Sequence, residues 1–196
     1  MRVIWRNVSN IEYICYNIAM TKIDDIYDAA DDYGLITSAQ ARALGVSDDE
    51  VVQYAARGRL VRMARGVYRV PVWPYQEHAP YAVAVQAAGE GAYLYGESVV
   101  SLLGLCPTDP RFIWVATPRR TRRSLGAGVK LIWRRSPDMV AWYEGIPCQK
   151  AADAICVAAL TLGPERSIEA AREAERMGYI TPAELTMIEG EVDVHA

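Results

Sequence analysis

Residues 34–70 constrain the fold more than any other part of this 196-residue chain. The run from Gly34 to Ser47 is typical of a short helix, a tight glycine turn and the start of a second helix. Residues 57–70 then predict a strand, a turn and a strand that carry several arginines. Helix, turn, helix and basic hairpin, in this order, are typical of a winged helix-turn-helix, whose second helix enters the DNA major groove. The alternative is a small structural domain that does not contact DNA.

Capping boxes fix where these helices begin. Thr37 lies three residues before Gln40 and Ser47 three residues before Glu50, the spacing at which each side chain bonds the other's backbone amide. Gly45 suits the left-handed position that ends the first of the two helices. An earlier helix is predicted over about 22–33, which gives the three helices of a small bundle.

Charge is concentrated in the centre of the chain. Residues 57–135 hold 13 Lys and Arg against 4 Asp and Glu, whereas both flanking parts are acidic. Within 111–135 there is no acidic residue, and the basic ones are Arg111, Arg119, Arg120, Arg122, Arg123, Lys130, Arg134 and Arg135. Cations that neutralise phosphates release counterions, so such a surface predicts salt-sensitive binding of nucleic acid. The alternative is a solvated face paired with the chain's own acidic ends.

The predicted recognition helix begins with three acidic residues, Asp48, Asp49 and Glu50. They would repel phosphates, and a run of this kind more often serves as a helix cap. Base contacts are therefore expected from Ser47, Gln53 and Arg57, with Tyr54 on a phosphate.

The predicted fold class is α+β, with an N-terminal winged helix-turn-helix followed by a mixed α/β C-terminal domain ending in helices. The expected divisions are an N-terminal extension at 1–19, the DNA-binding domain at 20–72 and the second domain at 76–191. In the second domain, strands are predicted at 112–116 and 129–134, a hairpin at 140–148, and helices at 76–89, 99–103, 150–161, 164–177 and 182–190.

Other classes of protein receive no support from the sequence. The four cysteines (Cys15, Cys106, Cys148 and Cys156) show no C-x-x-C spacing and are expected to be small buried hydrophobes in a reducing cytosol. With only two histidines, we predict no metal site, no cofactor and no catalytic residues. No apolar stretch reaches the roughly 18 residues of a membrane span, so the predicted location is cytoplasmic.

Several segments resemble one known family. Residues 34–41, 45–47 and 58–71, above all Arg65-Gly66-Val67-Tyr68, look like the amino-terminal winged-helix domain of AbiEi-family antitoxins. The segments at 98–105, 117–120 and 145–150, with the helix pair from Arg172 to Glu184, resemble that family's carboxy-terminal domain. The resemblance covers about residues 20–190.

The resemblance implies a type IV antitoxin that represses its own operon by binding inverted repeats in the promoter. The implied partners are that double-stranded DNA and a nucleotidyltransferase-like toxin, and the second domain would supply antitoxicity. DNA contact would fall to the helix that begins at Ser47 and to Arg62 and Arg65, with Arg57, Arg59 and Arg69 nearby.

The basic loop of the second domain is a separate candidate site, made by Arg119, Arg120, Arg122 and Arg123. Family members more often carry basic or neutral residues where this chain has the acidic run at 48–50.

Three alternatives remain open: an orphan DNA-binding regulator without a toxin, a module that sequesters a protein, and a DNA-processing nuclease. The nuclease is disfavoured because metal-assisted cleavage wants clustered carboxylates, which 111–135 lacks.

Overall fold

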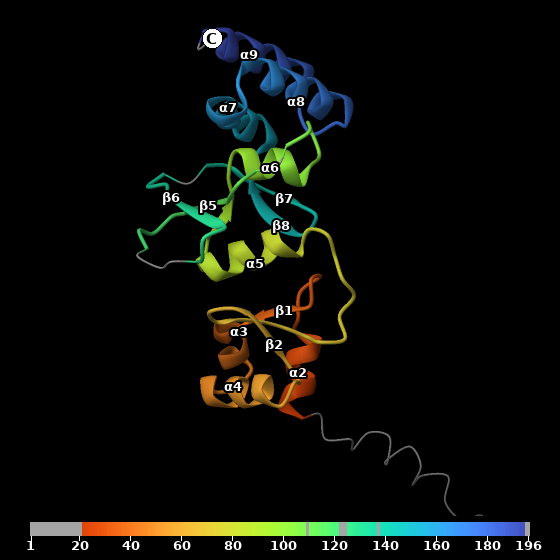
Figure 1. Ribbon diagram of the computed structural model, residues 1–196, viewed down its shortest axis with the longest axis vertical. Helices are drawn as coiled ribbons and strands as arrows, with labels where there is room; N and C mark the ends of the chain where they lie inside the picture. Colours follow the sequence, from red (N-terminus) through yellow and green to blue (C-terminus); the bar gives the residue numbers. More distant parts are fainter. Residues whose placement is uncertain (1–20, 109, 122–124, 137, 195–196) are drawn as a thin grey trace, which may run out of the picture.

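The computed structural model describes residues 21–194 apart from 109, 122–124 and 137, so the predicted extension at 1–19 lies outside the described residues. The chain folds as two parts stacked along its long axis (Figure 1). The amino-terminal domain runs from helix α2 to strand β3, and the carboxy-terminal domain runs from helix α5 to helix α9.

The amino-terminal domain is a winged helix-turn-helix. Its elements are α2 (Lys22–Asp28), β1 (Leu35–Thr37), α3 (Ser38–Ala43), α4 (Asp48–Ala56), β2 (Val61–Ala64) and β3 (Val67–Arg69). The three strands form an antiparallel sheet in the order β1-β3-β2, and the wing is the turn between β2 and β3. Ile23, Ile26, Ile36, Val51 and Tyr68 pack together in a core between the helices and this sheet.

The sequence prediction differs from the structure in two places here. The helix predicted over 22–33 ends at Asp28. Residues 35–37, placed within the helix-turn-helix run, form β1, and Leu35 and Thr37 pair with Arg69 and Val67 of β3. The capping box at Thr37 begins α3 only after this strand, and the strand itself depends on a partner some thirty residues away.

The carboxy-terminal domain is a mixed sheet between helices. Its elements are α5 (Ala79–Ala88), β4 (Tyr93–Leu94), α6 (Glu97–Leu102), β5 (Ile113–Thr117), β6 (Val129–Trp133), β7 (Val140–Tyr143), β8 (Ile146–Gln149), α7 (Ala151–Leu162), α8 (Pro164–Arg176) and α9 (Pro182–Val194). The strand order is β6-β5-β4-β8-β7, with β5–β6 and β4–β8 parallel and the other pairs antiparallel. Helix α5 lies on the side of the amino-terminal domain, α6 lies on the other side, and α7 to α9 cap the far end (Figure 1).

Most elements of this domain lie within a few residues of their predicted positions. The exception is β4, which the sequence did not predict. The third capping box is present: Thr181 Oγ1 donates to Glu184 Oε2 at 2.9 Å and accepts from the Glu184 amide at 3.3 Å. None of the helices in the described part of the chain is long and apolar enough to cross a membrane.

The two domains share a packed boundary. Leu35 and Val67 of the wing sheet are buried in the core of the carboxy-terminal domain together with the small residues of α5. Tyr33 donates its hydroxyl to the backbone carbonyl of Glu144 at 2.6 Å, and Gln86 of α5 donates to the Asp31 carboxylate. Burial at this boundary raises the pKa of Asp31. The wing sheet therefore has one face on the helix-turn-helix and the other on the second domain.

The cysteines only partly follow the prediction. Cys106 and Cys148 are buried, whereas Cys156 is half-buried. Cys15 lies outside the described residues.

Candidate nucleic-acid interface

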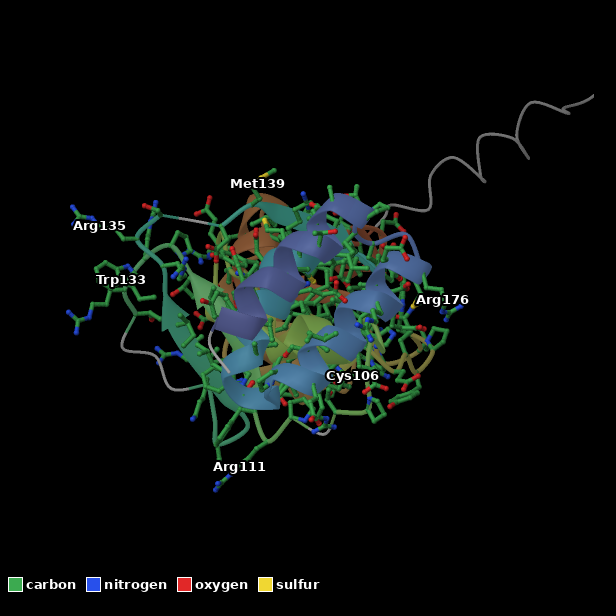
Figure 2. All side chains as sticks on the ribbon, turned by 90° about the horizontal axis from the view of Figure 1, so that it is seen from above. Cys106, Arg111, Trp133, Arg135, Met139 and Arg176 are labelled. Atoms are coloured by element: carbon green, nitrogen blue, oxygen red, sulfur yellow. The ribbon has the colours of Figure 1, made fainter. Side chains whose placement is uncertain are left out.

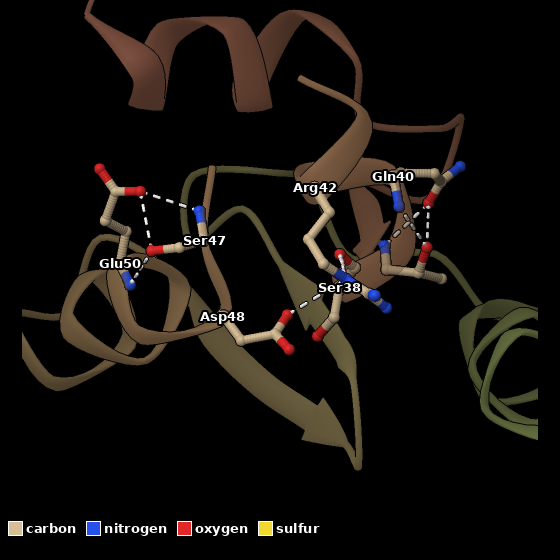
Figure 3. A network of polar contacts seen from close by, with 7 residues as sticks. Ser38, Gln40, Arg42, Ser47, Asp48 and Glu50 are labelled. Atoms are coloured by element: carbon tan, nitrogen blue, oxygen red, sulfur yellow. Dashed lines mark hydrogen bonds and ion pairs between the residues drawn. The ribbon is translucent and has the colours of Figure 1, made fainter. Parts of the chain in front are cut away.

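The amino end of the recognition helix α4 is closed by a complete capping box (Figure 3). Ser47 Oγ accepts from the Glu50 amide at 3.3 Å and donates to Glu50 Oε2 at 2.9 Å, and the same carboxylate oxygen accepts from the Ser47 amide at 2.8 Å. Ser47 was predicted as a base contact, and its hydroxyl can donate to a base only by giving up its bond to Glu50.

Most of the acidic charge at this end of α4 is paired within the domain. Lys22 Nζ lies 2.8 Å from Glu50 Oε1. Arg42 Nε lies 3.4 Å from Asp48 Oδ1 (Figure 3). The bond from Lys22 and the bonds from Ser47 lower the pKa of Glu50 to about 2. Glu50 therefore acts as a cap, as the sequence indicated for this run, and the negative charge facing DNA is smaller than three carboxylates suggest.

The outer face of α4 carries Val52 and Gln53, both exposed, whereas Val51 is buried. Tyr54, predicted on a phosphate, is half-buried and packs against the core of the amino-terminal domain. The side chain of Val52 is 55% exposed. Gln53 can accept and donate at a base edge, and Val52 presents methyl groups of the kind that contact thymine.

The arginines that follow α4 have different surroundings. Arg57, Arg59 and Arg62 are exposed, and none of them has an ion pair within the described residues. Arg69 is half-buried and donates from its Nη2 to the carbonyl of Trp73 at 3.3 Å. Arg69, predicted to lie near the DNA contacts, thus holds the linker against β3.

Arg65, in the wing turn, lies on a cleft between the two domains. The cleft has a volume of about 860 Å³ and is also lined by Arg42 of α3 and by Arg119 and Arg120 of the basic loop. The sequence treated the wing and the basic loop as separate sites, and the structure brings their arginines to one cavity. Arg122 and Arg123 lie outside the described residues. No sequence signal announces this convergence, because it depends on how the domains pack.

The charged groups that this surface offers are mainly guanidinium groups. In the part of the chain that the structure describes, no group of three or more His, Cys, Asp or Glu side chains could hold a metal ion. Exposed guanidinium groups bind phosphates through paired hydrogen bonds, which is the chemistry that this surface offers.

One of the comparisons with known proteins bears on the amino-terminal domain. No curated protein matches the sequence. Among solved structures, the crystal structure of the RV2827C protein from Mycobacterium tuberculosis aligns with 86% of this chain and 79% of its own, at 15% identity and a TM-score of 0.39. Residues 24–71, which span α2 to the end of the wing, match a family described as transcriptional regulator, AbiEi antitoxin. The winged-helix domain of this chain is therefore similar to that of the AbiEi family of antitoxins and transcriptional regulators.

Proposed function

We propose that this protein is an autorepressor that binds inverted repeats in its own promoter, with α4 in the major groove. The observation that carries the proposal is the exposed outer face of α4, which presents Gln53 to base edges. Arg57 and Arg62, which follow in the chain, are exposed as well and make no ion pair with the residues that the structure describes. Arginine side chains in this position anchor the protein to phosphates and fix its register on the duplex. An inverted repeat would take two copies, one on each half-site.

We also propose that the protein is the antitoxin of a type IV system, with a nucleotidyltransferase-like toxin as its partner. The family match supports an antitoxin of the DNA-binding kind. The basic loop, through Arg119 and Arg120, is the candidate surface of the second domain. Coexpression tests this part: the protein should restore growth to cells that express the product of the adjoining nucleotidyltransferase gene, and charge reversal at both arginines should reduce the rescue. Absence of any rescue would leave a regulator without antitoxin action.

DNA binding is tested by fluorescence anisotropy with a labelled fragment of the upstream promoter. Gln53→Ala should weaken binding to the promoter but not to a scrambled duplex, by about 1–3 kcal/mol, because only a base contact is lost. Arg62→Ala should weaken binding to both duplexes. It should also reduce the slope of log affinity against log salt concentration by about one, because a phosphate contact is lost.

A matched control is Arg172→Ala in α8, whose guanidinium pairs with Glu189 at 3.0 Å in the far part of the second domain. This variant should bind both duplexes like the parent. Equal affinity of the parent for the promoter and the scrambled duplex would contradict sequence-specific repression. A folded Arg62→Ala variant with an unchanged salt slope would remove β2 from the interface.

A further inference from the structure

The cleft between the domains gathers four cations from three separate segments. Arg42 comes from α3, Arg65 from the wing turn, and Arg119 and Arg120 from the loop after β5. Figure 1 shows how this arises, because α5 lies directly above the wing sheet and α3 and brings the edge of the second domain to the wing. The cavity of about 860 Å³ falls within the roughly 300–1,000 Å³ typical of small-molecule sites.

The cations of this cleft are not matched by acidic groups. Arg65, Arg119 and Arg120 make no ion pair within the described residues, and only Arg42 has a carboxylate partner. Two acidic side chains, those of Asp31 and Glu90, line the same cavity.

Asp31 is occupied by other donors. Its Oδ1 accepts from the amides of Tyr33 at 2.9 Å and Leu35 at 2.8 Å, and its Oδ2 accepts from Gln86. Glu90 is exposed and has no ion pair in the described part of the chain. The cavity therefore keeps an excess of unpaired guanidinium groups, which suits a ligand that carries several negative charges.

Part of the remaining wall of the cleft is apolar and includes an aromatic ring. Ala82 and Val85 of α5 and Pro147 of β8 supply aliphatic surface. Trp142 of β7 also lines the cavity, and its side chain is 70% exposed. An exposed indole offers a face on which a planar ring can stack.

We propose that the cleft binds a small phosphorylated molecule of the nucleoside triphosphate class. The arginines of the wing and the basic loop would hold the phosphates through forked hydrogen bonds, and Trp142 would stack on the base. Such a ligand would touch both domains at once, so its binding depends on their relative placement.

One consequence concerns DNA and rests on the proposed function. Arg65 would serve both the phosphates of the ligand and the promoter, so the two would compete for it. The coupling between two ligands is reciprocal. If a triphosphate weakens the binding of promoter DNA, promoter DNA must weaken the binding of the triphosphate by the same factor.

Isothermal titration of the full chain, without DNA, tests the site. The probes are ATP, inorganic triphosphate and adenosine. We expect ATP and triphosphate to bind and adenosine not to, because the phosphates supply the charge. The double variant Arg65→Ala, Arg119→Ala should lose about tenfold or more in affinity, since each removes a charge-assisted contact. Trp142→Ala should lower the affinity for ATP and leave the affinity for triphosphate unchanged.

The matched control is Arg111→Ala, which removes a cation from the same basic stretch but does not line the cleft. Arg111 extends from the second domain into solvent (Figure 2), so ATP affinity should not change. Absence of binding by both ATP and triphosphate would overturn the proposal, as would unchanged affinity in the double variant with a parental circular dichroism spectrum. Equal affinity for ATP and triphosphate would overturn the stacking role of Trp142. If the protein binds ATP but not the promoter, only the proposed function is refuted. If it binds the promoter but neither ATP nor triphosphate, only the proposal of a ligand site in the cleft is refuted.

Discussion

Gly34 occupies a position where an added methyl group has no room. Its φ is +67°, in the left-handed region, and an ideal Cβ there would lie 2.3 Å from Cγ and 2.6 Å from Cβ of Trp73. Trp73 belongs to the linker between the domains and donates its Nε1 hydrogen to the carbonyl of Asp32 at 3.0 Å. The substitution Gly34→Ala must therefore push the indole away from the surface on which it rests.

The cost can be compared with that at Gly104, which has a φ of +63° and nothing within 4 Å of an added Cβ. In both substitutions, placing alanine in the left-handed backbone region costs about 1–2 kcal/mol. Both also stabilise the protein by a smaller amount, because alanine lowers the conformational entropy of the unfolded chain. Only Gly34→Ala also loses the Trp73 hydrogen bond, about 1 kcal/mol, and part of the packing of a half-buried indole, about 2 kcal/mol. We expect the free energy of unfolding to fall by about 3 kcal/mol more for Gly34→Ala than for Gly104→Ala.

Urea denaturation followed by circular dichroism and tryptophan fluorescence measures this difference. With a urea m-value of about 3 kcal/mol/M for a chain of this size, the midpoint of Gly34→Ala should lie about 1 M below that of Gly104→Ala. Equal midpoints with equal m-values would refute the reasoning, because they would show that the indole can leave Gly34 at no cost.

Three further predictions concern a cap, a titration and a thiol. Ser47→Ala and Thr181→Ala should each cost about 1 kcal/mol of stability in urea denaturation, because each removes an N-cap, and only the first should also weaken promoter binding in the anisotropy assay. Lys22 and Ser47 hold the pKa of Glu50 at about 2 in the folded protein, below its ordinary value of 4.5, so this stabilisation is complete above about pH 4.5 and is lost as the pH falls toward 2. Glu50→Gln should therefore flatten the acid limb of the stability curve, and an unchanged limb would contradict the pairing. Burial raises the pKa of the Cys148 thiol to about 12, so a thiol reagent should label this residue at the rate of unfolding, and fast labelling of the native protein would disprove its burial.

Local sequence was sufficient to place helix starts, because a capping box acts within four residues. The boxes at Thr37, Ser47 and Thr181 all begin helices in the structure. Strands β1 and β4 could not be predicted in the same way. They are three and two residues long, too short for a period-two pattern, and each is fixed by partners distant in sequence such as Arg69 and Cys148.

The site was harder to predict for the same reason. The acidic run looked like a barrier to DNA, because its partners Lys22 and Arg42 lie on helices α2 and α3 and no local pattern pairs them with α4. Arg65 and Arg119 stand far apart in sequence, so only the packing of one domain on the other places both at one cleft. Residue type predicts that these side chains bind anions, and tertiary structure decides which of them line the same cleft.

The wing sheet connects the two activities proposed for this protein. Alternate residues of a strand point to opposite faces, and here Ile36 and Tyr68 are buried in the amino-terminal core while their neighbours Leu35 and Val67 are buried in the core of the second domain. Strands β1 and β3, buried on both faces, cannot slide relative to either domain without exposing apolar side chains to water, which costs roughly 25 cal/mol for each Å². A duplex bound to α4 therefore meets the second domain in one orientation. Any ligand that moves α5 must either move the wing with it or break this packing, which gives the cleft a physical route to the DNA-binding surface.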